Sequence, residues 1–125
     1  MAARIAKVDS GHFLEHRDFF AAAVDRDAEA FAAVRAGGGQ PALRNAALVA
    51  TGISERAREL DRDLLRLKTL APEKVHPDIT TGLALARASR AGGIAAARSN
   101  LPLIEDEAFR REIEDRLDRK LAAAR

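Results

Sequence analysis

The chain is organised around one stretch near its middle, His76-Pro77-Asp78-Ile79-Thr80-Thr81-Gly82, which opens a helix predicted to run as far as Ile104. Small residues recur along this helix at helical spacing: Gly82, Ala86, Ser89, Gly93 and Ala97. Residues three or four positions apart share one helix face, so this face carries almost no side-chain bulk. We therefore expect a crowded central helix that another backbone can approach closely.

The first predicted helix begins after Asp9 or Ser10, whose side chains can cap a first turn, and runs to about Ala36. Its apolar stripe is expected to be buried and consists of Phe13, Phe20, Val24, Phe31 and Val34. Asp27 falls on this stripe or at its edge. The glycines at positions 37–39 do not follow a strand, so they favour an interhelical turn over a phosphate-binding loop.

Two further helices complete the predicted architecture. A helix from about Ala42 to Leu70 has the alternating spacing of a bundle seam, formed by Ile53, Ala57, Leu60, Leu64 and Leu67. The last helix, from about Glu105 to Ala124, repeats an apolar residue every fourth position, at Phe109, Ile113, Leu117 and Leu121. The predicted fold is all-α, a single domain over residues 1–125 built as an antiparallel bundle of four main long helices.

Length and composition favour an oligomer. Much of the 47% hydrophobic content is alanine, so the core of a monomer would be thin. The second helix should be roughly 43 Å long. A compact globule of this size is only about 36 Å across, so that helix should overhang it. We expect a homodimer or larger oligomer in which two copies pack antiparallel through the small-residue face.

Charge and composition exclude several classes of protein. The chain has no cysteine, which removes disulfides, thiolate nucleophiles and cysteine-ligated zinc. Its net charge is +2, and the two signs are interspersed, which indicates a solvated surface and no nucleic-acid-binding stripe. No apolar run could span a bilayer, and residues 1–11 lack the core of a signal peptide. We expect a soluble cytoplasmic protein with neither nucleic acid nor membrane as a partner.

The histidines at the start of the first helix form a motif of their own. His12, Glu15 and His16 match the inverted zinc-protease pattern His-x-x-Glu-His. Two histidines one helical turn apart can share a metal, but the sequence marks out no third ligand. We therefore predict no metal and interpret the residues as a solvent-facing or interface histidine pair.

Polar groups stand at both ends of the central helix. Asp78 occupies the expected N-cap position, where a carboxylate accepts hydrogen bonds from free backbone N–H groups. At the other end, Arg98 can interact with the helix dipole, and Asn100 suits a left-handed cap before Pro102. Capping explains these residues without a function, and a binding or catalytic site is the alternative.

Three stretches carry a resemblance to a known family. Asp27-Ala28-Glu29-Ala30-Phe31 is similar to an Asp-Ala-x-Ala-Phe helix, and Ala50-Thr51-Gly52-Ile53 resembles the start of a long helix. The span 78–109 resembles a Ser-Asp-Ala-Gly opening followed by Asn-Val-Arg-Ile-Asn and Leu-Ile-x-Asp-x-x-Phe, with matches at Asp78, Arg98, Asn100, Leu103, Ile104, Asp106 and Phe109. Together they resemble the formimidoyltetrahydrofolate cyclodeaminases and methenyltetrahydrofolate cyclohydrolases. We expect a short form, without the N-terminal Pro-Gly-Gly-Gly-Ser loop and helix of that family.

The resemblance implies an enzyme of folate one-carbon metabolism that opens or closes a C–N bond at an amidine-type carbon. It implies a tetrahydrofolate derivative as the substrate and no tightly bound cofactor. Asp78 and Asp27 would transfer protons, Arg98 would anchor a carboxylate, and Asn100 would orient the substrate. Residues 78 and 98 are roughly 30 Å apart on one helix. In an antiparallel dimer, Asp78 of one subunit would instead lie beside Arg98 and Asn100 of the other.

Two other interpretations remain open from the sequence. The chain could be a non-catalytic helical homologue with an interaction or regulatory role. It could also be an enzyme of the same fold recruited to another small cyclic substrate.

Overall fold

The chain folds into helices throughout the part that a computed structural model describes, residues 2–119, with side chains described for residues 11–119. Four α-helices follow one another: α1 (Ala2–Arg35), α2 (Gly39–Leu70), α3 (His76–Asn100) and α4 (Glu107–Asp118). Short 3₁₀ helices, η1 (Glu73–Val75) and η2 (Leu101–Leu103), precede α3 and follow it. The described residues contain no strand, so the predicted all-α class with four main helices is confirmed.

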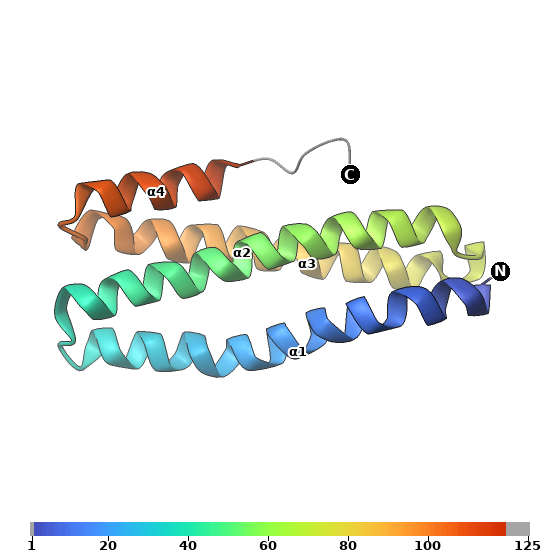
Figure 1. Cartoon of the computed structure of the whole chain (residues 1–125), viewed down its shortest axis with the longest axis horizontal. Coiled ribbons are helices and arrows are strands. Elements are labelled where there is room, and N and C mark those ends of the chain that lie inside the picture. The colour runs from blue at the N-terminus through green and yellow to red at the C-terminus, as the bar shows by residue number, and fades with distance from the viewer. Residues whose placement is uncertain (1, 120–125) are drawn as a thin grey trace.

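Figure 1 shows α1, α2 and α3 lying along one long axis, with the chain reversing at each short connection and α4 covering one end. The helix that contacts all three others is α2, so α2 and not α3 is the central helix. Its 32 residues lie beside the 34 residues of α1. The expected overhang of α2 beyond a compact globule is therefore wrong, because the molecule is elongated along the same axis.

The small-residue face of α3 packs against α2 of the same chain. A Cβ atom placed on Gly93 would lie 2.8 Å from the carbonyl oxygen of Ala50 and 3.0 Å from the backbone nitrogen of Ser54. Farther along the same face, Ala86 and Ala97 are buried. The face does admit a close backbone, as predicted, but the prediction that it packs on a second copy is wrong because α2 occupies it.

Helix α1 differs from its prediction at its start and in its buried face. It begins at Ala2, and positions 9 and 10 lie inside it, since no glycine or proline interrupts residues 2–10. The predicted apolar stripe is wrong at Val24 and Phe31, which are 70% and 62% exposed. The face turned toward the bundle instead carries three residues seven positions apart, His16, Ala23 and Ala30. Small alanines let α1 approach its neighbour more closely than a phenylalanine stripe would.

The connection between α1 and α2 is the predicted glycine turn. Gly37 and Gly39 have φ angles of 80° and 67°, in the left-handed region where glycine carries no steric penalty. The second helix starts at Gly39, slightly before the predicted start. Gln40 then ties this end of the molecule together, since its Nε2 donates to Leu103 O at 2.9 Å and its Oε1 accepts from Glu105 N at 2.9 Å.

Helix α4 closes the core at that same end. Its N-cap is Asp106, whose Oδ1 accepts a hydrogen bond from Phe109 N at 3.0 Å. The last helix ends at Asp118 instead of near residue 124, and the predicted stripe residue Leu121 lies outside the described residues. The core here is one cluster formed by Ala47, Ala50, Ala97, Leu101, Ile104, Ile113 and Leu117. Of the predicted α2 seam, only Ala57 is fully buried, and the other members are partly buried.

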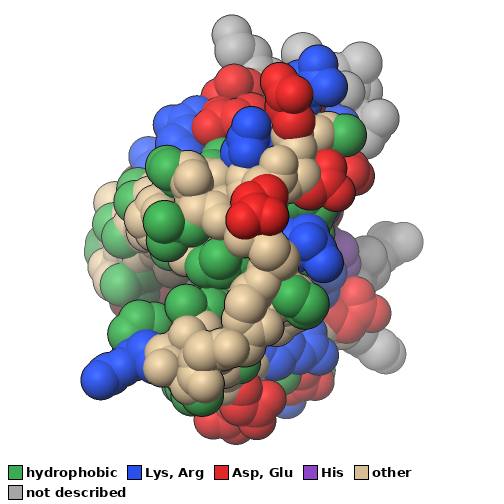
Figure 2. All heavy atoms as spheres, turned by 90° about the vertical axis from the view of Figure 1, so that its left-hand side faces the viewer, with side chains coloured by type: hydrophobic (Ala, Val, Ile, Leu, Met, Phe, Trp, Pro, Cys, Tyr) green, Lys and Arg blue, Asp and Glu red, His purple; other side chains and the backbone are tan. Residues whose placement is uncertain are grey.

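Figure 2 looks onto this end of the molecule. Hydrophobic side chains gather over its middle, and acidic and basic side chains are interspersed above and below them. The mixture of signs on this face agrees with the solvated surface that the sequence predicts.

Candidate functional site

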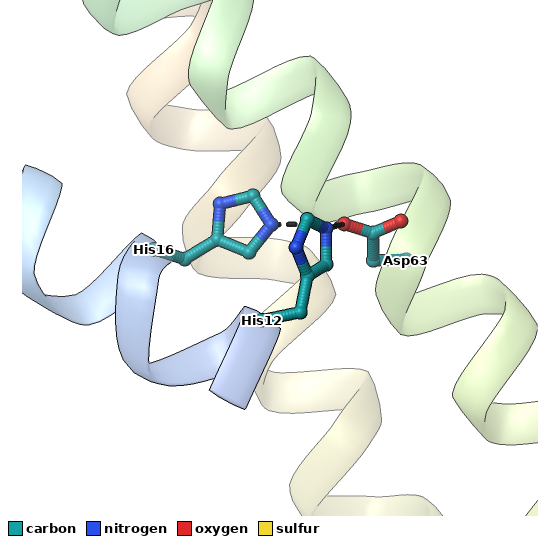
Figure 3. A group of neighbouring side chains, drawn as sticks. All are labelled: His12, His16 and Asp63. Carbon is teal, nitrogen blue, oxygen red and sulfur yellow. Dashed lines mark hydrogen bonds and ion pairs between the residues drawn. The ribbon is translucent and has the colours of Figure 1, made fainter. Parts of the chain in front are cut away.

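Two histidines of α1 meet an aspartate of α2 in the interior of the molecule (Figure 3). Asp63 Oδ2 lies 2.6 Å from His12 Nε2 and 2.9 Å from His16 Nε2. His16 is 2% exposed and Asp63 9% exposed, whereas the His12 side chain is 48% exposed. The interpretation as a solvent-facing or interface pair is therefore wrong for His16, whose partner is an acid of the neighbouring helix.

The hydrogen-bond pattern assigns the proton on His16. Arg56 Nε donates to His16 Nδ1 at 3.1 Å, so Nδ1 is the acceptor and the ring proton is on Nε2, facing Asp63. Because an ionised carboxylate only accepts, the Nε2 atom of His12 must also be a donor to Asp63. In the neutral imidazole of half-exposed His12, Nδ1 is then the basic nitrogen, and it lies 3.7 Å from Glu15 Oε2.

The electrostatics keep Asp63 ionised. Burial by itself would raise the pKa of the Asp63 carboxyl. Hydrogen bonds from His16 and His12, with the nearby charges of His12 and Arg62, outweigh the burial and hold the pKa of Asp63 below its usual value. The site therefore contains a fixed buried anion behind a partly exposed imidazole.

A cavity of about 190 Å³ opens beside this cluster, lined by His12, Phe13, Arg62, Asp63, Arg66 and Leu67. Its lining combines one imidazole, one carboxylate and two guanidiniums with two apolar side chains. An imidazole backed by a carboxylate can accept and return a proton, and guanidiniums can bind an anionic group. The cavity thus has the groups needed for proton transfer on an acidic ligand.

A divalent metal is a poor match for the same cluster. His12, His16 and Asp63 do supply three ligand atoms within 4.8 Å of one another, and two histidines with one carboxylate are a known ligand set. A histidine that ligates a metal through one nitrogen normally donates a proton from the other. His16 Nδ1 instead accepts from the cationic Arg56, so we assign no metal to this cluster.

The residues that the family resemblance singled out do not line this cavity. Asp78 is exposed in the first turn of α3, where Val75 and not Asp78 holds the N-cap position. Arg98 lies in the last turn of the same helix, which is continuous between them, so they are at opposite ends of α3. Asp27 is exposed on α1. Within the described chain, the structure does not bring these residues together in one site.

The groups at the end of α3 are engaged locally. Arg98 Nη2 donates to Asp118 Oδ1 at 2.8 Å, and Arg98 Nε lies 3.6 Å from Glu114 Oε2, so α4 supplies two acids to this guanidinium. The Asn100 amide donates to Ala96 O at 3.1 Å. The predicted left-handed cap is wrong, because Asn100 has a φ of −87° and the chain continues into η2.

Sequence reasoning missed Arg56 and Asp63. Both lie on one face of α2, with Leu60 and Leu67, at helical spacing. An acid on a face that is otherwise partly apolar, facing a helix with a histidine pair, is the signal that could have found Asp63. Neither α1 nor α2 shows this signal when it is considered alone.

The sequence matches the formiminotransferase-cyclodeaminase family over residues 10–119. Neither a curated protein nor a solved structure matches the chain. Among the described helices, none has the length and apolar character needed to cross a membrane. The family match spans the histidine pair of α1 and all of α2, α3 and α4, and it covers most of the chain. The protein belongs to the formiminotransferase-cyclodeaminase family.

Proposed function

We propose that the protein opens or closes a C–N bond at an amidine-type carbon of a reduced folate, as a methenyltetrahydrofolate cyclohydrolase or formimidoyltetrahydrofolate cyclodeaminase. The observation that carries this proposal is half-exposed His12, held by the buried anion Asp63 in a cavity with two guanidiniums, in a chain of this family. The folate is the substrate, and no tightly bound cofactor is part of the proposal.

In the cyclohydrolase direction, His12 Nδ1 takes a proton from water as the water oxygen bonds to the methenyl carbon. One C–N bond of the resulting adduct then breaks as the imidazolium returns the proton to the departing ring nitrogen. The hydroxyl of the adduct releases its own proton to solvent, which leaves a neutral formyl group. Asp63, 2.6 Å from the other ring nitrogen, orients the imidazole and supplies the opposite charge while the proton is held.

In the cyclodeaminase direction, a folate nitrogen bonds to the formimidoyl carbon and loses its proton to His12. The bond from that carbon to the amino nitrogen then breaks, and the same proton leaves with ammonia. Both directions use one base that becomes the acid of the second step.

The test is the loss of near-ultraviolet absorbance as methenyltetrahydrofolate is hydrolysed. We expect the wild-type rate to exceed the spontaneous rate and His12→Gln to lower kcat by about 10²–10⁴-fold. His76→Gln is the matched control, because the only hydrogen bond of the His76 side chain among the described residues is with Ala71 O at 3.0 Å, and His76 lies outside the cavity. A wild-type rate equal to the spontaneous rate would favour the non-catalytic homologue or a different small cyclic substrate.

The positions matched to the family motif are a second location for the same chemistry. Asp78 and Asp27 are exposed and would transfer protons, and Arg98 and Asn100 would bind and orient the substrate across two subunits. Such a site needs an interface other than the α3 face that α2 covers, and Arg98 must leave Asp118. This location is correct if Asp78→Asn and Arg98→Ala each abolish turnover and mixing the two variants restores it. His12→Gln must then retain turnover.

A homodimer in the cytoplasm completes the proposal. Large apolar side chains on α1 and α3 are more than half exposed, namely Val24, Phe31 and Leu85. Covering them in a subunit interface would remove apolar area from water. Light scattering after size exclusion tests the dimer, since a monomer would give 13.5 kDa.

A further inference from the structure

Two arginines of the His12 cavity, Arg62 and Arg66, make no hydrogen bond to a carboxylate among the described residues. Arg87, Arg98 and Arg116 each hydrogen-bond to a carboxylate of a neighbouring helix. Arg62 and Arg66 lie one turn apart on α2 and both line the cavity. Among the described residues, no carboxylate lies within ion-pair distance of Arg66.

Arg62 carries a donor that lacks an acceptor. Its Nε atom is buried and has no hydrogen-bond partner within the described part of the chain. The nearest carboxylate oxygen, Asp63 Oδ1, lies 3.5 Å away in an ion-pair contact that does not have hydrogen-bond geometry. Buried polar groups are almost always paired. Arg58 Nε is likewise buried without a partner but lies outside the cavity, so it is the position of Arg62 in the cavity lining that assigns its missing acceptor to the cavity.

The charges around the cavity point to the nature of that acceptor. Its lining has two guanidiniums and one carboxylate, and the carboxylate already accepts hydrogen bonds from His12 and His16. The remaining positive charge is therefore not neutralised by the lining itself. A guanidinium binds a carboxylate through paired N–H donors, which single point charges cannot reproduce.

We propose that Arg62 and Arg66 form a subsite for a carboxylate group of the ligand, beside the imidazole of His12. The proposal rests on the function proposed above, because it takes the ligand of this cavity to be the molecule on which His12 acts. His12, Arg62 and Arg66 line the same cavity of about 190 Å³, so a carboxylate bound by these guanidiniums would lie close to the imidazole. Arg62 and Arg66 are binding residues and take no part in moving the proton.

The experiment measures binding of p-aminobenzoylglutamate, which carries two carboxylates but has no amidine carbon to react. Isothermal titration calorimetry on the full chain should show binding to wild type that weakens as salt is raised. Arg66→Gln and Arg62→Gln should each weaken it at least about tenfold, the loss expected for one charge-assisted hydrogen bond. Arg111→Gln removes the same charge from exposed Arg111 on α4 and should leave the affinity unchanged.

The dimethyl ester of the same probe supplies the second comparison. It keeps the aromatic amide but has no negative charge, so we expect no measurable binding. Each of three results would overturn the subsite. The wild-type protein could fail to bind the acid, it could bind the ester as well as the acid, or Arg66→Gln could bind the acid as well as wild type does. Arg66 gives the cleaner variant, because it is exposed and, among the described residues, forms no hydrogen bond or ion pair with the buried Asp63.

The subsite and the proposed function can fail separately. Binding of the probe requires no turnover, so a chain that binds it through both arginines and does not hydrolyse methenyltetrahydrofolate retains the subsite and loses the function. A chain that turns over the folate with equal KM in wild type and Arg66→Gln keeps the function and overturns the subsite.

Discussion

Gly92 and Gly93 stand next to each other in α3, and alanine at the two positions should have opposite effects on stability. Both substitutions remove the glycine penalty inside a helix, which is worth roughly 1 kcal/mol. A Cβ at Gly92 would meet nothing within 4 Å. Gly92→Ala should therefore keep most of that gain and raise the free energy of unfolding by about 0.5–1 kcal/mol.

At Gly93 the same atom would meet the backbone of α2. The Cβ would lie 2.8 Å from Ala50 O and 3.0 Å from Ser54 N, and neither backbone atom can rotate away as a side chain could. Relief requires α2 and α3 to separate along a face that also buries Ala97. Overpacking a core costs about 1–3 kcal/mol, and a contact with backbone belongs at the upper end. After the propensity gain, Gly93→Ala should lose about 2 kcal/mol net.

Urea unfolding followed by far-ultraviolet circular dichroism, at one protein concentration, measures both variants against wild type. Thermal unfolding gives a second measure, since about 1 kcal/mol shifts the Tm of a domain of this size by roughly 4 °C. The expected shifts are a fall of roughly 8 °C for Gly93→Ala and a rise of a few degrees for Gly92→Ala. Equal stability of the two variants would refute the close approach of α3 to α2, on which the fold described above depends.

Two further substitutions test the charged contacts. Asp63→Asn should cost about 1–3 kcal/mol at neutral pH, because the histidines lose a charged acceptor. The pKa of Asp63 is lowered on folding, so the wild-type protein should lose this contribution to its free energy of unfolding as the pH falls below about 4 toward the folded pKa. Unfolding measured at a series of pH values should show no such loss for Asp63→Asn. Glu55→Gln removes the two-point contact with Arg116, at 2.6 and 3.0 Å, that joins α2 to α4. It should cost about 1 kcal/mol or less, since both groups are about a quarter exposed, and should speed amide exchange in α4 while leaving that of α1 unchanged.

The elements of the fold were predictable because their signals are local. A glycine run, two prolines and long apolar periodicities predicted the four helices and the α1–α2 turn, with the largest errors at the start of α1 and the end of α4. The arrangement of the helices was less accessible. The small residues of α3 correctly indicated a close approach, but they cannot say whether the approaching backbone belongs to the same chain. The closest backbone at Gly93 is that of α2.

The error in α1 has a different physical origin. Phe31 and Val24 are more hydrophobic than alanine, so a stripe chosen by hydrophobicity passes through them. The structure instead turns Ala23 and Ala30 inward and leaves both larger residues exposed, because close helix packing rewards small side chains as well as apolar ones. The same rotation brings His16 into the interior. A helix considered alone does not show this, and the site was missed for the same reason.

The buried charges of the site are hard to explain as a device for stability alone. Taking Asp63 and His16 out of water is costly, and well-packed apolar residues in place of a buried charged network are often as stable or more so. A chain whose core is largely alanine has little surplus with which to offset that cost. Arg56, His16 and Asp63 form a continuous chain of hydrogen bonds that ends at the half-exposed ring of His12, where a cavity opens. In this network His16 and Asp63 both have hydrogen-bond partners, and the imidazole of His12 faces the cavity. This is the organisation expected when that imidazole takes part in catalysis.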